Sequence, residues 1–115
     1  MEEAYKLSLF SDSNIKVSSD IDECCENANY IYTDVWVSMG QEKGASKKKK
    51  DLGKYKISSK VLKKCAEDCK VLHCLPAHRG EEIDSDVIDS KQLIVFDQAE
   101  NRLHVQKAIM CSLMR

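Results

Sequence analysis

The sequence predicts an α/β fold in which parallel strands are flanked by helices. Two observations support this class. Short apolar segments, among them 30–37 and 70–75, alternate regularly with segments of helical pattern. The apolar segments have the character of short buried strands, and strands separated by helices imply parallel pairing through right-handed crossovers. Ligands of such sheets bind beyond the carboxyl ends of the strands.

The amino-terminal half contains four expected elements. Residues 2–10 suit a helix, and residues 14–17 suit a short strand. Residues 20–28 suit a second helix, because Asp20 is a favourable N-cap. The aromatic and β-branched residues 30–37 predict the next strand.

Segment 40–56 follows this strand and holds three of the four glycines and a run of four lysines. It is therefore expected to be a mobile, solvated loop. Two interpretations stay open for it: a lid that closes over an anionic site, or an ordinary charged surface loop.

The carboxyl-terminal half continues the alternation. Residues 58–69 suit a helix, 70–75 a strand, 84–90 a helical turn and 92–97 another strand, and residues 99–114 form an amphipathic pattern typical of a final helix. Polar residues follow two of the strands directly, so the candidate site lies there.

Charge and hydropathy exclude several classes of protein. Lysine and arginine (18) nearly balance aspartate and glutamate (19), giving a formal net charge of -1. A nucleic-acid binder that depends on a global basic field is therefore not expected. No apolar run approaches the ~20 residues of a membrane span, and the amino-terminal residues are acidic where a signal peptide is basic. These features predict a soluble, cytoplasmic protein without a membrane partner.

Six cysteines raise the question of disulfides or a metal. Without a secretory signal, a reducing cytosol is expected to keep the thiols free. Cys65 and Cys69 would share one face of a helix, with His73 following, but the zinc-typical spacing of two intervening residues is absent. Ordinary helix cysteines are the favoured interpretation over a zinc site.

The first candidate site lies after the strand that contains residues 31–33. Asp34, Ser38 and the backbone N–H of Met39 could together hold an amino acid, with Asp34 binding an ammonium group and the Met39 N–H a carboxylate. The alternative is that Asp34 only caps the next segment.

The second candidate site is Cys74, which follows the strand at 70–73. Neighbouring strand residues point to opposite faces, so a nucleophilic dyad of His73 and Cys74 is not expected. Two other interpretations remain for Cys74. Its thiol could accept a proton or a hydrogen bond from an amine, or it could pair with His78. Pro76 is the one proline, and the preceding peptide can be cis at modest cost, although a trans loop proline is commoner.

The third candidate is Arg102. A position near the start of the final helix would favour an anion, and its guanidinium could grip a phosphate or polarise a carbonyl. The alternative is a surface salt bridge with Glu100.

Three stretches together, YTDVWVSMGQE (32–42), HCLPAHRGEE (73–82) and VFDQAENRLHVQKAIM (95–110), resemble the carboxyl-terminal part of ornithine carbamoyltransferase, from about Glu2 onward. In the related carbamoyltransferases that act on aspartate, the corresponding motif resembles HPLP where this chain has HCLP. The carbamoyltransferases that act on putrescine lack the SMG motif. The resemblance therefore points to ornithine. It implies an incomplete Rossmann-like domain, part of a doubly wound parallel sheet.

The resemblance also implies the reaction and the ornithine contacts. A carbamoyl group would pass from carbamoyl phosphate to the δ-amine of L-ornithine, giving L-citrulline and phosphate in arginine metabolism. Asp34, Ser38 and the Met39 backbone would bind ornithine, with residues 38–40 on a lid. Cys74 would accept the proton from the attacking amine or form a hydrogen bond with it.

For carbamoyl phosphate, the resemblance implies contacts with Cys74, the Leu75 carbonyl and Arg102. It implies no metal or organic cofactor, and a homotrimer for the full-length family. The partners would be the two small-molecule substrates.

The resemblance does not extend to the family's amino-terminal carbamoyl phosphate domain, because its Ser-Thr-Arg-Thr and His-Pro-x-Gln motifs have no counterpart here. The first strands of the ornithine domain are missing too, so the strand at 14–17 would lack its neighbour. Residues 1–115 are thus expected to be a fragment, inactive alone and marginally folded or self-associating. The rival interpretation is a non-catalytic remnant or a split-gene half that acts only with a partner chain.

Overall fold

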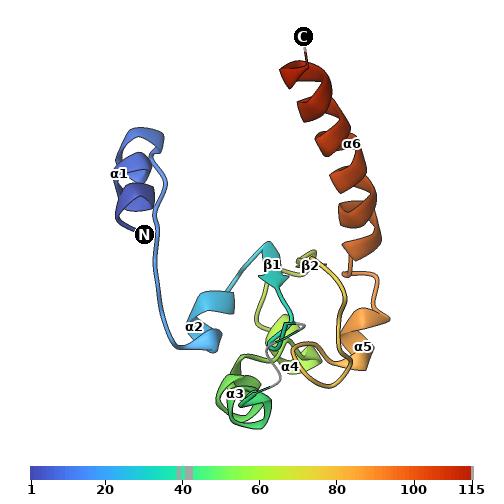
Figure 1. Cartoon of the computed structure of the whole chain (residues 1–115). Helices are drawn as coiled ribbons and strands as arrows, with labels where there is room; N and C mark the ends of the chain where they lie inside the picture. Colours follow the sequence, from blue (N-terminus) through green and yellow to red (C-terminus); the bar gives the residue numbers. More distant parts are fainter. Residues whose placement is uncertain (39, 41–42, 115) are drawn as a thin grey trace.

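A computed structural model describes residues 1–38, 40 and 43–114. Short helices surround two parallel strands in a central body, and helices α1 (Glu2–Ser11) and α6 (Val95–Leu113) project from it (Figure 1). The Cα radius of gyration is 16.6 Å, against about 13 Å for a compact chain of this length. The two projecting helices make the molecule more extended than an ordinary globular domain.

The sheet confirms the α/β class. Strand β1 (Tyr30–Thr33) pairs in parallel with β2 (Lys70–His73), in a register that places Thr33 opposite His73. The connection between them contains helices, as a parallel crossover requires. Both strands are shorter than the expected 30–37 and 70–75. After β2 the backbone turns sharply at Leu75, whose φ is positive.

A third strand at 92–97 was expected, and this prediction is wrong in most of its length. Only a minimal bridge forms on the free edge of β2: the Val71 N–H donates to the Gln92 carbonyl (2.8 Å), and the Ile94 N–H donates to the Val71 carbonyl (3.0 Å). Helix α6 then begins at Val95, so it starts four residues before the expected range of 99–114.

The expected strand at 14–17 does not form. A strand needs a neighbour to satisfy its backbone hydrogen bonds, and the sheet of the described residues offers none at this point. Both flanking helices form, although the second is shorter than the expected 20–28. Helix α1 covers the expected 2–10, and α2 (Ile21–Cys25) starts after Asp20, whose carboxylate accepts from the backbone N–H of Asp22 at 2.9 Å.

The expectation of a loop over 40–56 is wrong for most of its length. Residues of the lysine run lie on helix α3 (Ala45–Leu52), which is followed by the 3-10 turn η1 (Gly53–Tyr55). Lysine is a good helix former, and Gly44 adopts the left-handed conformation (φ 82°) at the N-cap. Residues 41 and 42 lie outside the described part of the chain.

The expected helix at 58–69 is reduced to α4 (Ser59–Leu62). The backbone beyond it bonds to the segment after α2 instead of continuing the helix: the Asn27 N–H donates to the Lys64 carbonyl (3.0 Å), and the Ala66 N–H donates to the Ala28 carbonyl (3.1 Å). Cys65 and Cys69 therefore do not share a helix face, contrary to the prediction.

The core lies between the sheet and the short helices. Its buried side chains form one cluster, which includes Val87 of α5 (Ser85–Ile88), the helical turn expected at 84–90; the other members are Cys25, Ile31, Ile57, Val61, Leu62, Cys69, Val71 and Ile83. Helix α1 has no buried residue, and α6 buries only Val95.

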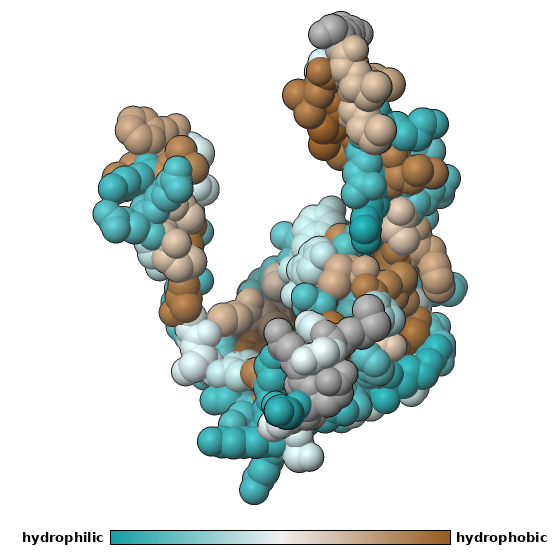
Figure 2. Space-filling view, in the orientation of Figure 1, coloured by the Kyte–Doolittle hydropathy of each residue, from teal (hydrophilic) through white to brown (hydrophobic). Residues whose placement is uncertain are grey.

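Both projecting helices expose apolar side chains (Figure 2), among them Leu9 and Phe10 on α1 and Ile109 and Leu113 on α6. Contiguous exposed apolar surface of this kind favours association. None of the described helices is long and apolar enough to cross a membrane.

Candidate substrate site at the carboxyl edge of the sheet

Asp34 and Cys74 meet at the carboxyl edge of the sheet. Each residue directly follows its strand, and the register that pairs Thr33 with His73 places the two next positions side by side. The Cys74 thiol donates a hydrogen bond to Asp34 Oδ1 over 2.8 Å. The same oxygen accepts from the Val35 N–H at 2.6 Å, so Asp34 caps its own segment and also contacts the thiol.

This contact sets the ionisation of the pair. Hydrogen bonds from the Cys74 thiol and the Val35 N–H lower the pKa of Asp34 below its ordinary value. The pKa of Cys74 is raised, chiefly because its proton is held by the Asp34 carboxylate. At neutral pH the pair is therefore a carboxylate and a neutral thiol, which argues against a resting Cys74 thiolate.

Replacing Asp34 with asparagine removes the negative acceptor and should lower the Cys74 pKa. Because the thiolate is the nucleophile, Asp34→Asn should accelerate iodoacetamide alkylation of Cys74 by about threefold for each pKa unit removed, since the larger thiolate fraction is partly offset by a lower nucleophilicity. The midpoint of the rate profile should shift to lower pH. The rate is measured by peptide mass spectrometry, with exposed Cys111 as the internal standard.

The matched control for this experiment is Asp51→Asn on helix α3, an exposed position away from the thiol. It should leave the Cys74 rate unchanged. Equal Cys74 rates in Asp34→Asn and the unsubstituted chain would show that the carboxylate does not hold the thiol proton.

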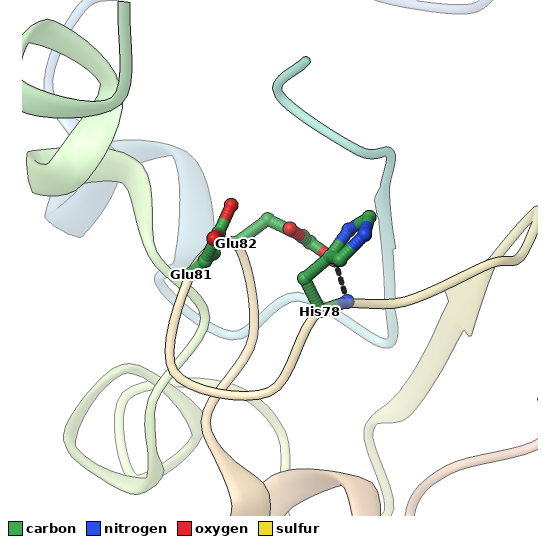
Figure 3. A group of neighbouring side chains, drawn as sticks. All are labelled: His78, Glu81 and Glu82. Atoms are coloured by element: carbon green, nitrogen blue, oxygen red, sulfur yellow. Dashed lines mark hydrogen bonds and ion pairs between the residues drawn. The ribbon is translucent and has the colours of Figure 1, made fainter. Parts of the chain in front are cut away.

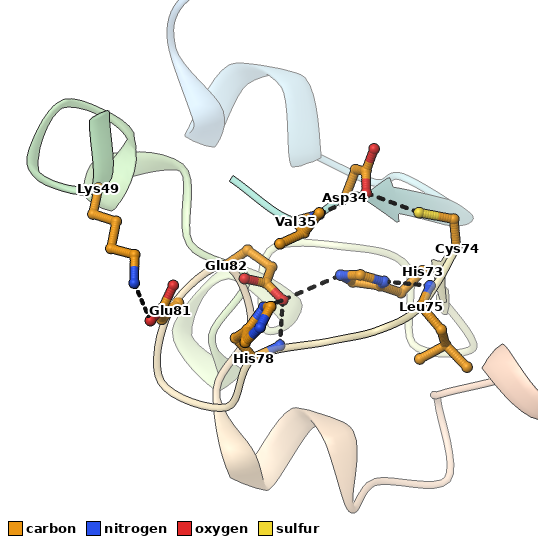
Figure 4. A network of polar contacts seen from close by, with 9 residues as sticks. All are labelled: Asp34, Val35, Lys49, His73, Cys74, Leu75, His78, Glu81 and Glu82. Carbon is orange, nitrogen blue, oxygen red and sulfur yellow. Dashed lines mark hydrogen bonds and ion pairs between the residues drawn. The ribbon is translucent and has the colours of Figure 1, made fainter. Parts of the chain in front are cut away.

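His73 is committed to a buried network and does not activate the thiol. Its Nδ1 accepts from the Leu75 N–H (2.8 Å), so the proton of the neutral ring lies on Nε2, which donates to Glu82 Oε1 (3.2 Å). Figure 4 shows His73 and Cys74 directed to different partners. The expectation that no His73–Cys74 dyad forms is consistent with this geometry. His78 also bonds Glu82, through its backbone N–H at 2.5 Å.

The backbone turns sharply after Cys74. Leu75 has a positive φ of 58°, and the Leu75–Pro76 peptide is cis, the rarer of the two forms weighed from sequence. The hydrogen bond from the Leu75 N–H to His73 fixes this turn against the buried network.

Cys74, Leu75 and Arg102 line one open groove of about 950 Å³ between the sheet edge and helix α6. Gln98 of the same helix secures α6 to the sheet: its Oε1 accepts from the His73 N–H (3.0 Å), and its Nε2 donates to the Tyr32 hydroxyl (3.2 Å). The groove therefore brings together two of the three candidate sites expected from the sequence, Cys74 and Arg102.

Arg102 occupies a different part of the helix from the one expected. Because α6 starts at Val95, Arg102 lies about two turns into the helix, beyond the reach of the N-terminal dipole. The alternative of a salt bridge with Glu100 is also absent: Glu100 pairs with His104 (3.5 Å), and Arg102 has no carboxylate partner among the described residues.

Ser38 lies in a neighbouring groove together with His78 and Glu81, separated from the Cys74 groove by Pro76. The structure thus does not place Ser38 beside the Asp34–Cys74 pair. Met39, the third residue of the predicted amino-acid site, lies outside the described residues.

The zinc interpretation with Cys65, Cys69 and His73 is not supported by the arrangement of the described residues. His73 points to Glu82, and Cys65 donates to the Val61 carbonyl (3.4 Å). Burial and the neighbouring thiols Cys69 and Cys25 raise the pKa of Cys65 to about 12.

Comparison with known proteins identifies the architecture. Residues 1–113 match the family described as aspartate/ornithine carbamoyltransferase, Asp/Orn binding domain. The ornithine carbamoyltransferase of Oceanobacillus iheyensis is 52% identical over 100 residues, which is 87% of this chain and 31% of that protein.

Solved structures agree with this match. The anabolic ornithine carbamoyltransferase of Campylobacter jejuni superimposes with a TM-score of 0.91 at 36% identity, over 97% of this chain and 37% of that one. The enzyme of Pyrococcus furiosus gives a TM-score of 0.73 at 48% identity, over 79% of this chain and 29% of that one. The chain spans about a third of the length of these relatives. It belongs to the aspartate/ornithine carbamoyltransferase family, within the Asp/Orn binding domain.

Proposed function

We propose that this chain supplies the ornithine side of an ornithine carbamoyltransferase site, as the carboxyl-terminal portion of the ornithine-binding domain. The reaction would transfer a carbamoyl group from carbamoyl phosphate to the δ-amine of L-ornithine, giving L-citrulline and phosphate. The observation that carries the proposal is the Asp34–Cys74 contact at the edge of a groove that also holds Arg102.

Ornithine would bind through Asp34, Ser38 and the Met39 backbone. The ionised Asp34 carboxylate suits an ammonium group, with which it would form a charge-assisted hydrogen bond. Ser38 lies one groove away, so its contribution requires the segment that carries it to move toward Asp34, as in the closing of a lid.

Cys74 would act as a hydrogen-bond acceptor for the attacking amine. The Asp34 carboxylate holds the thiol proton, which leaves the sulfur lone pairs free to accept an N–H. Its raised pKa favours this role over that of a thiolate base.

Carbamoyl phosphate would occupy the groove beside Leu75 and Arg102. The Leu75 carbonyl would accept from the carbamoyl NH2, and the guanidinium would bind the phosphate or stabilise charge on the carbonyl oxygen. The family's carbamoyl phosphate domain and its trimer would have to complete this site.

A hybrid enzyme tests the proposal. The segment of the Oceanobacillus iheyensis enzyme that matches this chain is replaced by residues 1–115, and citrulline and carbamoyl aspartate formation are measured. We expect turnover with ornithine and none with aspartate, because the contact residues of the proposed ornithine site are those of this chain. A folded hybrid of native oligomeric size that fails to use ornithine would refute the proposal and favour a non-catalytic remnant.

A further inference from the structure

A second polar cluster lies outside the Cys74 groove, in the loop that follows Pro76. His78, Glu81 and Glu82 each place one potential ligand atom within 4.8 Å of the others (Figure 3). Glu82 is fully buried, whereas the side chains of His78 and Glu81 are 48% and 31% exposed. The cluster is thus open to solvent on one side and anchored by a buried carboxylate on the other.

The buried carboxylate has one occupied and one vacant oxygen. Glu82 Oε1 accepts from His73 Nε2 (3.2 Å) and from the His78 N–H (2.5 Å), while Oε2 has no hydrogen-bond partner among the described residues. A buried, unpaired oxygen is costly. Hydrogen bonds to one oxygen of a carboxylate orient its other oxygen, as is usual around metal ligands.

We propose that His78, Glu81 and Glu82 bind a divalent first-row transition cation. One imidazole and two carboxylates form a donor set that suits Mn²⁺, Fe²⁺ or Zn²⁺, with water completing the coordination shell. Metal–ligand bonds of about 2.1 Å require ligand atoms about 3 Å apart. The side chains of His78 and Glu81 must therefore move slightly toward Glu82.

The Lys49 ammonium competes with a cation for this site. Its Nζ lies 2.5 Å from Glu81 Oε1, so the ammonium occupies one ligand when no cation is bound. An ion pair this exposed is weak, and a divalent cation would displace it. Removing the Lys49 charge should therefore tighten metal binding, whereas removing the charge of a residue with no part in the site should not.

Titration with Mn²⁺ alone, followed by electron paramagnetic resonance of the free ion, tests the site in the 115-residue chain. Mn²⁺ prefers oxygen and nitrogen to thiolates, so the six cysteines interfere little. We expect one site per chain, weakened at least about tenfold by His78→Ala and by Glu81→Gln, and strengthened by Lys49→Met.

The matched control is Glu100→Gln, which alters the exposed Glu100–His104 pair of α6. That pair has the same i,i+4 spacing as His78 and Glu82 but no buried carboxylate, so its loss should leave Mn²⁺ affinity unchanged. No binding at millimolar Mn²⁺, or equal affinity in His78→Ala and the unsubstituted chain, would overturn the proposal.

A second measurement needs no variant. In the unsubstituted chain, bound Mn²⁺ should broaden the ring proton resonances of His78 at concentrations that leave those of His104 sharp. Equal broadening of both would show non-specific surface binding and would overturn the proposal even if a variant failed to fold.

Discussion

The purified 115-residue chain is expected to convert ornithine and carbamoyl phosphate to citrulline at least about 10⁴-fold more slowly than the full-length Oceanobacillus iheyensis relative. Removing a single group that stabilises the developing charge costs about 10² to 10³ in rate. The groove contributes Arg102. The Ser-Thr-Arg-Thr and His-Pro-x-Gln motifs of the family's carbamoyl phosphate domain have no counterpart in this sequence. At least two such groups are therefore missing.

The measurement is a discontinuous citrulline assay at saturating ornithine, with the relative as the positive control and Cys74→Ala as the background. Signal equal to that background is the expected result. Turnover by the chain alone within about tenfold of the relative would contradict the proposal that charge stabilisation depends on groups outside these residues.

Replacing Glu82 with alanine is expected to destabilise the chain by about 3–5 kcal/mol. The carboxylate is fully buried and accepts from both His73 and the His78 backbone (Figure 4). Its removal leaves the buried His73 ring and the His78 backbone N–H without this acceptor, and it opens a void in the buried network. The free energy of unfolding of a small domain is about 5–15 kcal/mol in total, so this substitution would remove much of the chain's stability.

Urea unfolding followed by circular dichroism, in the presence of a chelator, measures this loss. Glu67→Ala is the matched control, because Glu67 is exposed and should change the free energy of unfolding little. Glu82→Gln should be milder than Glu82→Ala, since its side-chain oxygen can still accept. A loss of under about 1 kcal/mol in Glu82→Ala would mean that the network does not stabilise the fold.

Local patterns were sufficient to predict some of the helices but not all of them. Helix α2 follows from its capping residue Asp20, and the final helix α6 was expected from its amphipathic spacing. The strand at 14–17 was not realised, because a strand depends on a neighbour that local pattern cannot supply. The lysine run was misjudged, since its charge suggested a loop while its helix propensity prevailed.

The candidate site was predictable as a location but not as a set of contacts. Asp34 and Cys74 were both placed at the carboxyl ends of strands, yet their hydrogen bond depends on the strand register. Pairing the residues that directly follow the two strands would have predicted this contact. The role of Glu82 was missed because nothing local distinguishes it from the half-buried Glu81 beside it. Its burial arises only when the loop folds back on His73.

The central claim, that Asp34 faces ornithine at this groove, is tested most directly by the Michaelis constants of the hybrid enzyme carrying Asp34→Asn. Losing a hydrogen bond to a charged group costs about 1.5–3 kcal/mol, so the KM for ornithine should rise about 10- to 100-fold, with the KM for carbamoyl phosphate little changed. An unchanged ornithine KM in a folded, active hybrid would contradict the assignment of Asp34 to ornithine.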